Sequence, residues 1–199
     1  MIKKNITKKN NLNRKSIPKL TKNFQKIIKE IKESIENSNN TFNVLSDNYK
    51  FNFKIKELRR FSKFNNLVII GVGGSILGSE AIYEFLKKKI KKKIYFFDDI
   101  NEQKISKFKK EVNVNKTVFL IISKSGNTIE TLSNFFSLKI IEKVKKNIII
   151  ISEKKDNILY SLSKKFNLFY VEHKDYIGGR YSVLSEVGII PAYLMGLNI

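Results

Sequence analysis

One stretch of the chain, SKSGNTIET, places hydroxyls, a glycine and a lysine directly behind the apolar run VFLII. Ser123, Ser125 and Thr128 offer hydroxyl donors, and Gly126 lets the backbone bend so that N–H groups can point inward. Lys124 adds a positive charge beside them. A helix that begins at the end of this loop would turn its positive end toward the same point. The combination predicts a phosphate-binding cradle.

The residues after the glycine also predict the start of a helix. Asn127 and Glu130, three positions apart, match a capping box, so the helix is expected to begin at Asn127 or Thr128. In this interpretation Glu130 is a capping residue and not a catalytic one. The alternative for the loop is an ordinary helix cap without a ligand, since Ser, Asn and Thr cap many helices. The density of hydroxyls on both sides of Gly126 favours phosphate binding.

A glycine-rich loop, IIGVGGSILGSEA, follows an earlier apolar run. Gly74 and Ser75 lie where this loop leads toward a helix, and glycines there let a backbone approach a ligand closely. The dinucleotide-binding fingerprint would need a glycine at the position of Ile76, and no Gly-Lys-Ser/Thr follows for a P-loop. A nucleotide site is therefore not indicated, and a tight turn without a ligand is the alternative.

A third loop, YIGGRYSVLSEVG, presents an arginine behind two glycines. Arg180, behind Gly179, could bring a rigid guanidinium to a developing oxyanion. Taken alone, this arginine could equally be a surface residue that caps a carbonyl. Its position after an apolar run, like that of the other two loops, favours a role in a shared site.

The elements that position these loops are read from alternating apolar runs and amphipathic stretches. The runs are β-branched and apolar on both faces, as in parallel strands covered by helices on each side. They are LVIIG (67–71), KIYFF (93–97), VFLIIS (118–123), NIIIIS (147–152) and LFYVE (168–172). The stretches of helix length between them are 77–90, 101–112, 127–144 and 156–165. The pattern predicts an α/β fold, a doubly wound five-stranded parallel sheet flanked by helices.

The expected strand order places the three loops together. All three follow the carboxyl ends of strands, and ligands of open α/β sheets bind at that edge, where the strand order reverses. In the order 2-1-3-4-5 the reversal lies between the first and third strands. Those two strands carry the glycine-rich loop and the hydroxyl loop.

The two ends of the chain lack the alternation of apolar runs and amphipathic stretches. Residues 1–17 are rich in Lys and Asn, and Pro18 opens a helix with an apolar stripe. Residues 41–65 fit either an edge strand or a helix. A last helix starts near Ser185 and contains Pro191, which predicts a kink or an early stop. The domains expected are a basic tail with a helical extension, 1–65, and an α/β domain that carries the three loops, 66–199.

Composition narrows the class of protein. The 199 residues include no cysteine, which excludes disulfides and thiolate metal sites and fits a cytoplasmic protein. No apolar run approaches the roughly 20 residues of a membrane helix, so no membrane partner is expected. The net charge of +21 could indicate a nucleic-acid binder that uses Lys91–Lys93 and the N-terminal tail. Lysine supplies the charge and arginine is rare, which favours a compositional bias and no nucleic acid.

Three segments resemble, in order and spacing, motif regions of the glucose-6-phosphate isomerase family. They are GVGGSILGSEA, SKSGNTIET and GGRYSVLSEVGIIPA. The third is the most specific, and the second is shared with the wider sugar-isomerase (SIS) phosphosugar-binding domains. The resemblance covers about residues 66–199.

The resemblance implies an SIS fold and the reversible conversion of glucose 6-phosphate to fructose 6-phosphate. A base takes the proton from C2, a cis-enediolate forms, and C1 is reprotonated. No metal and no organic cofactor is implied. By resemblance Arg180 stabilises the enediolate charge and is the catalytic residue. The residues that bind the sugar 6-phosphate by resemblance are Gly74, Ser75, Ser123, Lys124, Ser125, Thr128 and Gly179.

The family's general base is a glutamate downstream of the GGR motif, and its ring-opening histidine also lies further on. The one histidine here, His173, precedes that motif and is expected to be a partly exposed residue at a strand end. The chain is therefore expected to be an N-terminal part of an enzyme that is a cytoplasmic homodimer at full length. The alternative is a non-catalytic SIS module that only binds a phosphosugar.

The last apolar stretch carries one more expectation. From Val187 to Leu197 the chain is almost continuously apolar, and two residues follow. This predicts an uncovered apolar surface and self-association of the isolated chain.

Overall fold

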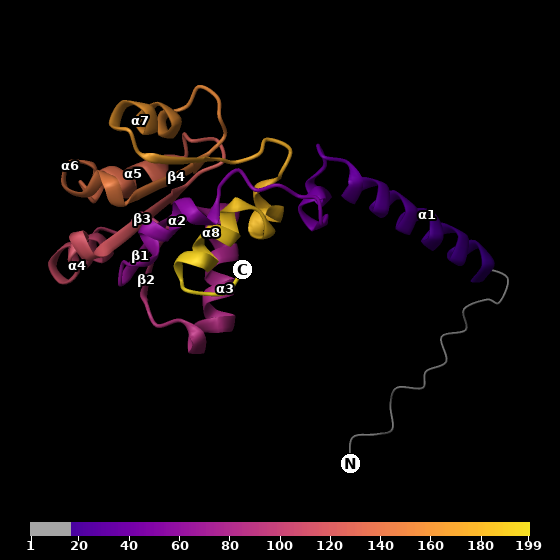
Figure 1. Ribbon diagram of the computed structural model, residues 1–199, viewed down its shortest axis with the longest axis horizontal. Helices are drawn as coiled ribbons and strands as arrows, with labels where there is room; N and C mark the ends of the chain where they lie inside the picture. Colours follow the sequence, from indigo (N-terminus) through magenta and orange to yellow (C-terminus); the bar gives the residue numbers. More distant parts are fainter. Residues whose placement is uncertain (1–16) are drawn as a thin grey trace, which may run out of the picture. The chain divides into compact units, whose positions relative to one another are not determined.

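The computed structural model describes residues 17–199, with side chains from Leu20 onward (Figure 1). The predicted basic tail falls largely on residues 1–16, which lie outside the described residues. The chain divides after Ser46 into two compact units, the second of which is Asp47–Ile199. This division falls earlier in the sequence than the expected boundary at residue 65.

The first unit holds one long helix and one short one. Helix α1 (Ile17–Glu36) confirms the helix predicted near Pro18, and η1 (Thr41–Leu45) follows it. Ion pairs of 3.7 Å join Lys26 to Glu30 and Lys29 to Glu33, one helical turn apart on exposed side chains. Pairs of this kind support a helix by only about 0.3–0.5 kcal/mol each.

The second unit is built on the predicted sheet. Its strands are β1 (Asn66–Ile70), β2 (Lys93–Phe97), β3 (Thr117–Ile122), β4 (Ile148–Ser152) and β5 (Phe169–Glu172). All pairings are parallel, and the order is β2-β1-β3-β4-β5. The order and the five strands are confirmed, with each strand end within one residue of its predicted place. The reversal of strand order therefore lies between β1 and β3.

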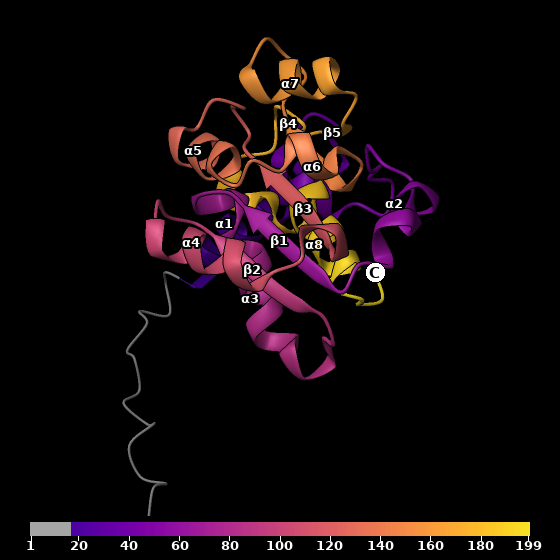
Figure 2. The same ribbon diagram turned by 90° about the vertical axis from the view of Figure 1, so that its left-hand side faces the viewer.

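Helices cover both faces of this sheet (Figures 1 and 2). The α-helices of the second unit are α2 (Ile55–Ser62), α3 (Leu77–Leu86), α4 (Glu102–Glu111), α5 (Ile129–Ser137), α6 (Ile141–Val144), α7 (Ile158–Phe166) and α8 (Glu186–Leu194). Its 3-10 turns are η2 (Gly73–Ser75), η3 (Lys87–Lys89), η4 (Val114–Lys116), η5 (Lys145–Asn147) and η6 (Gly179–Leu184). Residues 41–65, for which the sequence predicted either an edge strand or a helix, form η1, an irregular segment with a turn and bends, and α2.

Successive residues of each strand point to opposite faces of the sheet and pack into two separate hydrophobic cores. Val68, Ile70 and Phe119 pack with α4, α5, α6 and α7 on one face. Leu67 and Ile69 pack with α2 and α8 on the other face. All five of these side chains are fully buried, as a parallel sheet between two helical layers requires.

The helix predicted for 127–144 is wrong in length, because it is two helices. The chain breaks between α5 and α6 at Lys139, which has the left-handed φ of 49°. Leu138 and Ile140, on either side, are 4% and 0% exposed. The turn thus lets two apolar residues that flank an exposed lysine both reach the core, which an unbroken helix would not allow.

The predicted uncovered surface at Val187–Leu197 is also wrong. Val187, Ile190 and Leu194 of α8 are 0–3% exposed and belong to the core that also contains residues of α2 and of the sheet. Pro191 lies inside α8 without ending it, so the predicted early stop does not occur. The second unit therefore covers its own last helix, and self-association no longer follows from this segment.

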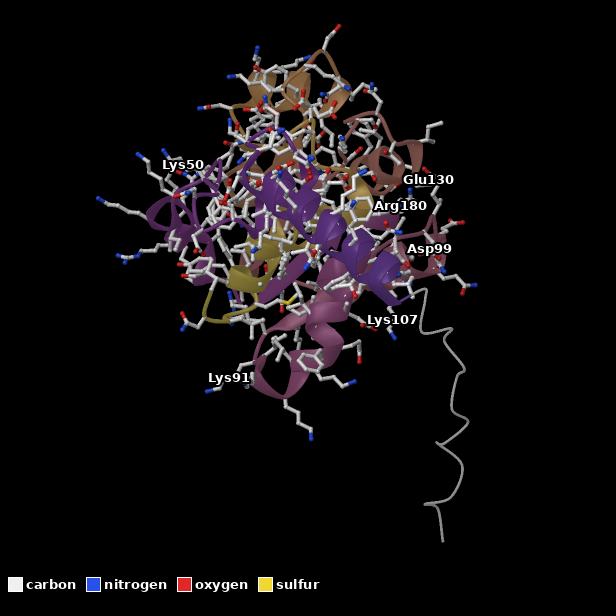
Figure 3. The ribbon with its side chains drawn as sticks, turned by 90° about the vertical axis from the view of Figure 1, so that its right-hand side faces the viewer. Lys50, Lys91, Asp99, Lys107, Glu130 and Arg180 are labelled. Carbon is white, nitrogen blue, oxygen red and sulfur yellow. The ribbon has the colours of Figure 1, made fainter. Side chains whose placement is uncertain are left out.

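Lysines gather where the helices of the sheet layers end. Such positions suit cations, because the C-terminal end of a helix carries partial negative charge. They include Lys87, Lys88, Lys89, Lys109, Lys110, Lys145, Lys146, Lys164 and Lys165. These segments precede strands, so they lie toward the amino edge of the sheet. Figure 3 shows Lys91, from the same edge, well apart from Arg180.

Candidate phosphosugar site

The three loops predicted to act together follow β1, β3 and β5. They are η2 with its flanking glycines, the segment from Ser123 to Thr128, and η6. Two of them leave the strands between which the order reverses. The topology thus places them at the edge where open α/β sheets bind ligands.

Three hydroxyls converge behind β3. The oxygens of Ser123 and Thr128 are 2.8 Å apart, and Ser125 Oγ lies 3.4 Å from each. Ser123 is buried at 1% exposure, whereas Ser125 is exposed. The triangle therefore opens from the end of a buried strand toward solvent, where an anion could enter.

Backbone amides already donate to two of these hydroxyls. The N–H of Gly126 donates to Ser123 Oγ at 3.1 Å, and the N–H of Asn127 donates to Ser125 Oγ at 3.3 Å. The hydroxyl hydrogens bond within the triangle, and because a hydroxyl rotates, each can turn from a neighbouring hydroxyl to an anion. Thr128 is the N-cap residue of α5 but makes no side-chain bond to the first turn. The positive end of that helix is thus also turned to the cradle.

The predicted capping box is wrong. The Asn127 side-chain oxygen does not cap α5 but accepts the N–H of Ile158, in the first turn of α7, at 2.9 Å. Helix α5 begins at Ile129, two residues after Asn127, and Glu130 is exposed. Asn127 therefore joins the cradle to the neighbouring helix, a pairing 31 residues apart that local spacing could not indicate.

Gly126 is required by the backbone itself. Its φ is +70°, and a Cβ there would lie 1.9 Å from Oδ1 of Asn157. Asn157 caps α7 by accepting the N–H of Tyr160 at 2.9 Å. The cradle thus rests directly on a capped helix start, which keeps its hydroxyls in place.

The first and third loops interlock through glycine. A Cβ on Gly74 would lie 2.3 Å from both the carbonyl carbon and oxygen of Gly179. The Ser182 hydroxyl lies 2.7 Å from the oxygen of Gly179 and 3.3 Å from that of Gly74, so it is shared between the two carbonyls. Ser75 lies in η2 beside this contact and is half-buried. The sequence indicated neither the close approach nor the shared serine.

Arg180 is the second residue of η6 and is exposed. Its guanidinium makes no hydrogen bond or ion pair with any residue of 17–199 that the structure describes. Gly179 beside it has open space where a side chain would be, and its backbone is not left-handed. The loop thus presents a cation, labelled in Figure 3, and beside it a half-buried glycine with open space next to its backbone.

The Lys124 side chain leaves the cradle. Its ammonium donates to the carbonyl oxygen of Asp175 at 2.6 Å and lies 3.5 Å from a carboxylate oxygen of Glu153. Glu153, 7% exposed, also pairs with Lys155. The positive charge expected beside the hydroxyls is therefore directed toward the loop that follows β5.

A buried carboxylate lies behind the third loop. Glu186, 1% exposed at the start of α8, accepts the Tyr49 hydroxyl at 2.9 Å and the N–H of Asn52 at 2.8 Å. Burial and this carboxylate hold the pKa of Tyr49 far above its usual range. Both oxygens of Glu186 are engaged, so the group ties the segment before α2 to α8 and is not free to act as a base.

His173 differs from its prediction. It was expected to be partly exposed, but it is 3% exposed just after β5. The carbonyl of Lys174 lies 2.9 Å from Nδ1 and can only accept, so Nδ1 carries the hydrogen. Burial, more than any neighbouring charge, lowers the pKa of this imidazole. The ring is thus a neutral core residue.

We expect this histidine to make the fold sensitive to mild acid. Below its ordinary pKa of about 6.5 the unfolded chain binds a proton that the folded chain refuses, so stability falls as pH drops. The loss is at most about 1.4 kcal/mol per pH unit between the two pKa values. Urea unfolding at pH 7 and pH 5 measures it, with His173→Asn as the variant that keeps a donor without titrating. Equal losses in both proteins would contradict the assignment.

Two further properties bear on the class of site. Among the described side chains, no group of three or more His, Asp or Glu residues is arranged to hold a metal ion. Within residues 17–199, no helix has both the length and the apolar character needed to cross a bilayer. The donors described above at the sheet edge are hydroxyls, backbone amides and the Arg180 guanidinium, and such donors suit an anion.

Comparison with known proteins agrees with this donor set. Residues 22–199 match the family model of phosphoglucose isomerase. A probable glucose-6-phosphate isomerase of Methanococcus maripaludis is 35% identical over 185 residues, which are 87% of this chain and 41% of the relative. The glucose-6-phosphate isomerase of Methanocaldococcus jannaschii is 32% identical over 149 residues, which are 73% of this chain and 36% of the relative. The chain thus spans less than half the length of these curated relatives.

Solved structures share the fold. A hypothetical protein of Thermus thermophilus gives a TM-score of 0.72 at 21% identity, over 93% of this chain and 48% of that chain. The glucose-6-phosphate isomerase of Chlamydia trachomatis gives 0.58 at 26% identity, over 68% of this chain and 27% of that chain. The first likeness concerns the fold alone, and the second joins the fold to the same family name.

Proposed function

Because this chain belongs to the phosphoglucose isomerase family, we propose that it provides an SIS-type phosphosugar-binding domain of a glucose-6-phosphate isomerase. Its substrate would be the sugar 6-phosphate of a reversible aldose–ketose isomerisation, a step of glycolysis and gluconeogenesis. The observation that carries the proposal is the triangle of hydroxyls within 3.4 Å at the start of α5. Neutral donors and a helix start converge there as a phosphate requires.

The phosphate would lie on Ser123, Ser125 and Thr128, with the sugar extending toward Ser75 and Gly179. Two serine hydroxyls that already accept backbone bonds can each give a hydrogen to a phosphate oxygen. The interlocked first and third loops would then face the sugar carbons. In this arrangement Gly74 acts by bringing the two loops into contact.

Arg180 would stabilise the charge of the enediolate. Removing the proton from C2 leaves negative charge on the oxygens of C1 and C2, and a guanidinium without a partner among the described side chains can bind that charge. A guanidinium cannot itself remove the proton, which needs a carboxylate with a tuned pKa. Glu186 is committed to Tyr49 and Asn52. We place the base and the ring-opening acid in the part of the family's length that this chain does not span.

The role of Arg180 separates an isomerase domain from a module that only binds phosphosugars. The variant is Arg180→Met, measured by calorimetry with fructose 6-phosphate and with a sugar phosphate whose carboxylate mimics the enediolate charge. We expect the carboxylate ligand to lose about tenfold to a hundredfold more affinity than fructose 6-phosphate, the worth of one charged hydrogen bond.

Arg59→Met, an exposed arginine on α2, is the matched control and should change neither affinity. If Arg180→Met weakens both ligands equally, Arg180 only holds phosphate, and a non-catalytic SIS module becomes the better description.

We further propose that the full-length family form acts as a cytoplasmic homodimer. This proposal rests on the family relationship alone. Light scattering on a full-length relative and on this chain tests the assembly.

A further inference from the structure

One side chain connects loops that follow three neighbouring strands. Lys124 follows β3, yet its ammonium donates to the carbonyl of Asp175, beyond β5. Glu153, directly after β4, lies 3.5 Å from the same nitrogen. Since β4 separates β3 from β5, the lysine crosses the sheet edge from the hydroxyl cradle to the loop of Arg180.

The bond to Asp175 falls at one end of the segment that carries the arginine. At the other end, the Ser182 hydroxyl lies within hydrogen-bond distance of the carbonyls of Gly74 and Gly179. Between these two points Ile177 is fully buried and Arg180 is exposed. The backbone segment that carries Arg180 is therefore held near both ends, by the hydroxyl loop through Lys124 and by the glycine loop through Ser182.

The lysine is itself held in this direction. At 2.6 Å the contact with Asp175 is a short, charge-assisted hydrogen bond, a strong class of contact. The carboxylate of Glu153 lies below it at 9% side-chain exposure and favours the ammonium in this place. The main chain adds to this, because the Lys124 carbonyl accepts the N–H of Glu153 at 3.0 Å.

We propose that Lys124 is a positioning residue that fixes the loop from Asp175 to Arg180 and does not bind the phosphate through its ammonium. The bond thereby fixes the position of the Arg180 loop relative to the hydroxyl cradle. The role of the loop, which is to present Arg180 to the sugar, rests on the proposed function. The contact between Lys124 and Asp175 does not, because it is present in the structure without a ligand.

The test is amide hydrogen exchange in the 199-residue chain without ligand. Lys124→Met keeps the apolar stem and removes the donor. We expect the amides of Tyr176, Ile177 and Tyr181, which are bonded within this loop, to exchange about tenfold to a hundredfold faster. Lys155→Met, which removes the other partner of Glu153, should leave them unchanged, and Lys124→Arg should restore most of the protection.

A second measurement uses the unaltered chain and inorganic phosphate. If phosphate shifts the amide signals of residues 123–128, the ammonium signal of Lys124 should stay in place. Unchanged exchange in Lys124→Met, or an ammonium signal that moves with bound phosphate, overturns the proposal. Absence of any phosphate binding would defeat the proposed function but leave the exchange result to decide on the positioning role. If Lys124→Met does not fold, the ammonium signal decides.

Discussion

Replacing Ser123, Ser125 and Thr128 together by alanine is expected to weaken fructose 6-phosphate binding by more than about a hundredfold. Each hydroxyl can give a hydrogen bond to a charged phosphate, worth roughly 1.5–3 kcal/mol. Because the three oxygens lie within 3.4 Å of one another, their contributions are coupled, and the full sum of three bonds is not expected. Even so, two such bonds at the lower limit already correspond to about a hundredfold. Calorimetry with the wild-type chain and the triple variant measures the loss.

The control for this variant is Ser137→Ala, which removes an exposed hydroxyl from the last turn of the same helix. It should bind fructose 6-phosphate as the wild type does. Unfolding curves are needed alongside, since the backbone N–H of Asn127 loses its acceptor when Ser125 is changed. Equal affinity in a folded triple variant and the wild type would rule out the cradle as the phosphate site.

Two alanine substitutions in the touching loops are expected to have opposite effects on stability. In Gly74→Ala the new Cβ would lie 2.3 Å from backbone atoms of Gly179, so one loop must move. Overpacking of this kind costs about 1–3 kcal/mol or more, and here it also separates the carbonyls that Ser182 joins. In Gly179→Ala the Cβ meets nothing within 4 Å. That chain should be as stable as the wild type, or more stable by up to about 1 kcal/mol.

Denaturant unfolding of the two variants tests this contrast, and sugar-phosphate binding adds to it. Gly179→Ala should fold normally but bind fructose 6-phosphate more weakly, because the space it fills is the space proposed for the sugar. Full affinity in Gly179→Ala would place the sugar elsewhere. Equal free energies of unfolding for the two variants would mean that the loops move apart to accept the new Cβ of Gly74→Ala without losing stability.

The sheet could be predicted from the sequence because each strand is specified by the types of its own few residues. Each strand is a short run of β-branched and apolar residues bounded by polar turns, and burial on both faces leaves a clear signal. The runs around Leu120 and Ile150 sit at the centre of the sheet, where that signal is strongest. The short break at Lys139 left no such signal, because the apolar spacing continues on both sides of it.

The contacts at the site that the sequence did not indicate have a common physical origin, because they are long-range. Asn127 bonds to α7, Lys124 to the loop after β5, and Glu186 to Tyr49 at a separation of 137 residues. A residue's type and neighbours indicate that it can donate or accept, but not which distant group it will meet. The sequence therefore predicted which loops come together, while the partners of each side chain became visible only in three dimensions.

The lysines at the helix ends bear on how an anion would reach the site. A five-residue strand is roughly 17 Å long, so the amino edge lies about that far from the carboxyl edge. The Debye length at physiological ionic strength is about 8 Å, so the field of those lysines is largely screened before it reaches the hydroxyl cradle. The lysines at the helix ends would therefore give a sugar phosphate little electrostatic steering toward the proposed site. Capture of the anion would then depend on the short-range donors of the hydroxyl cradle.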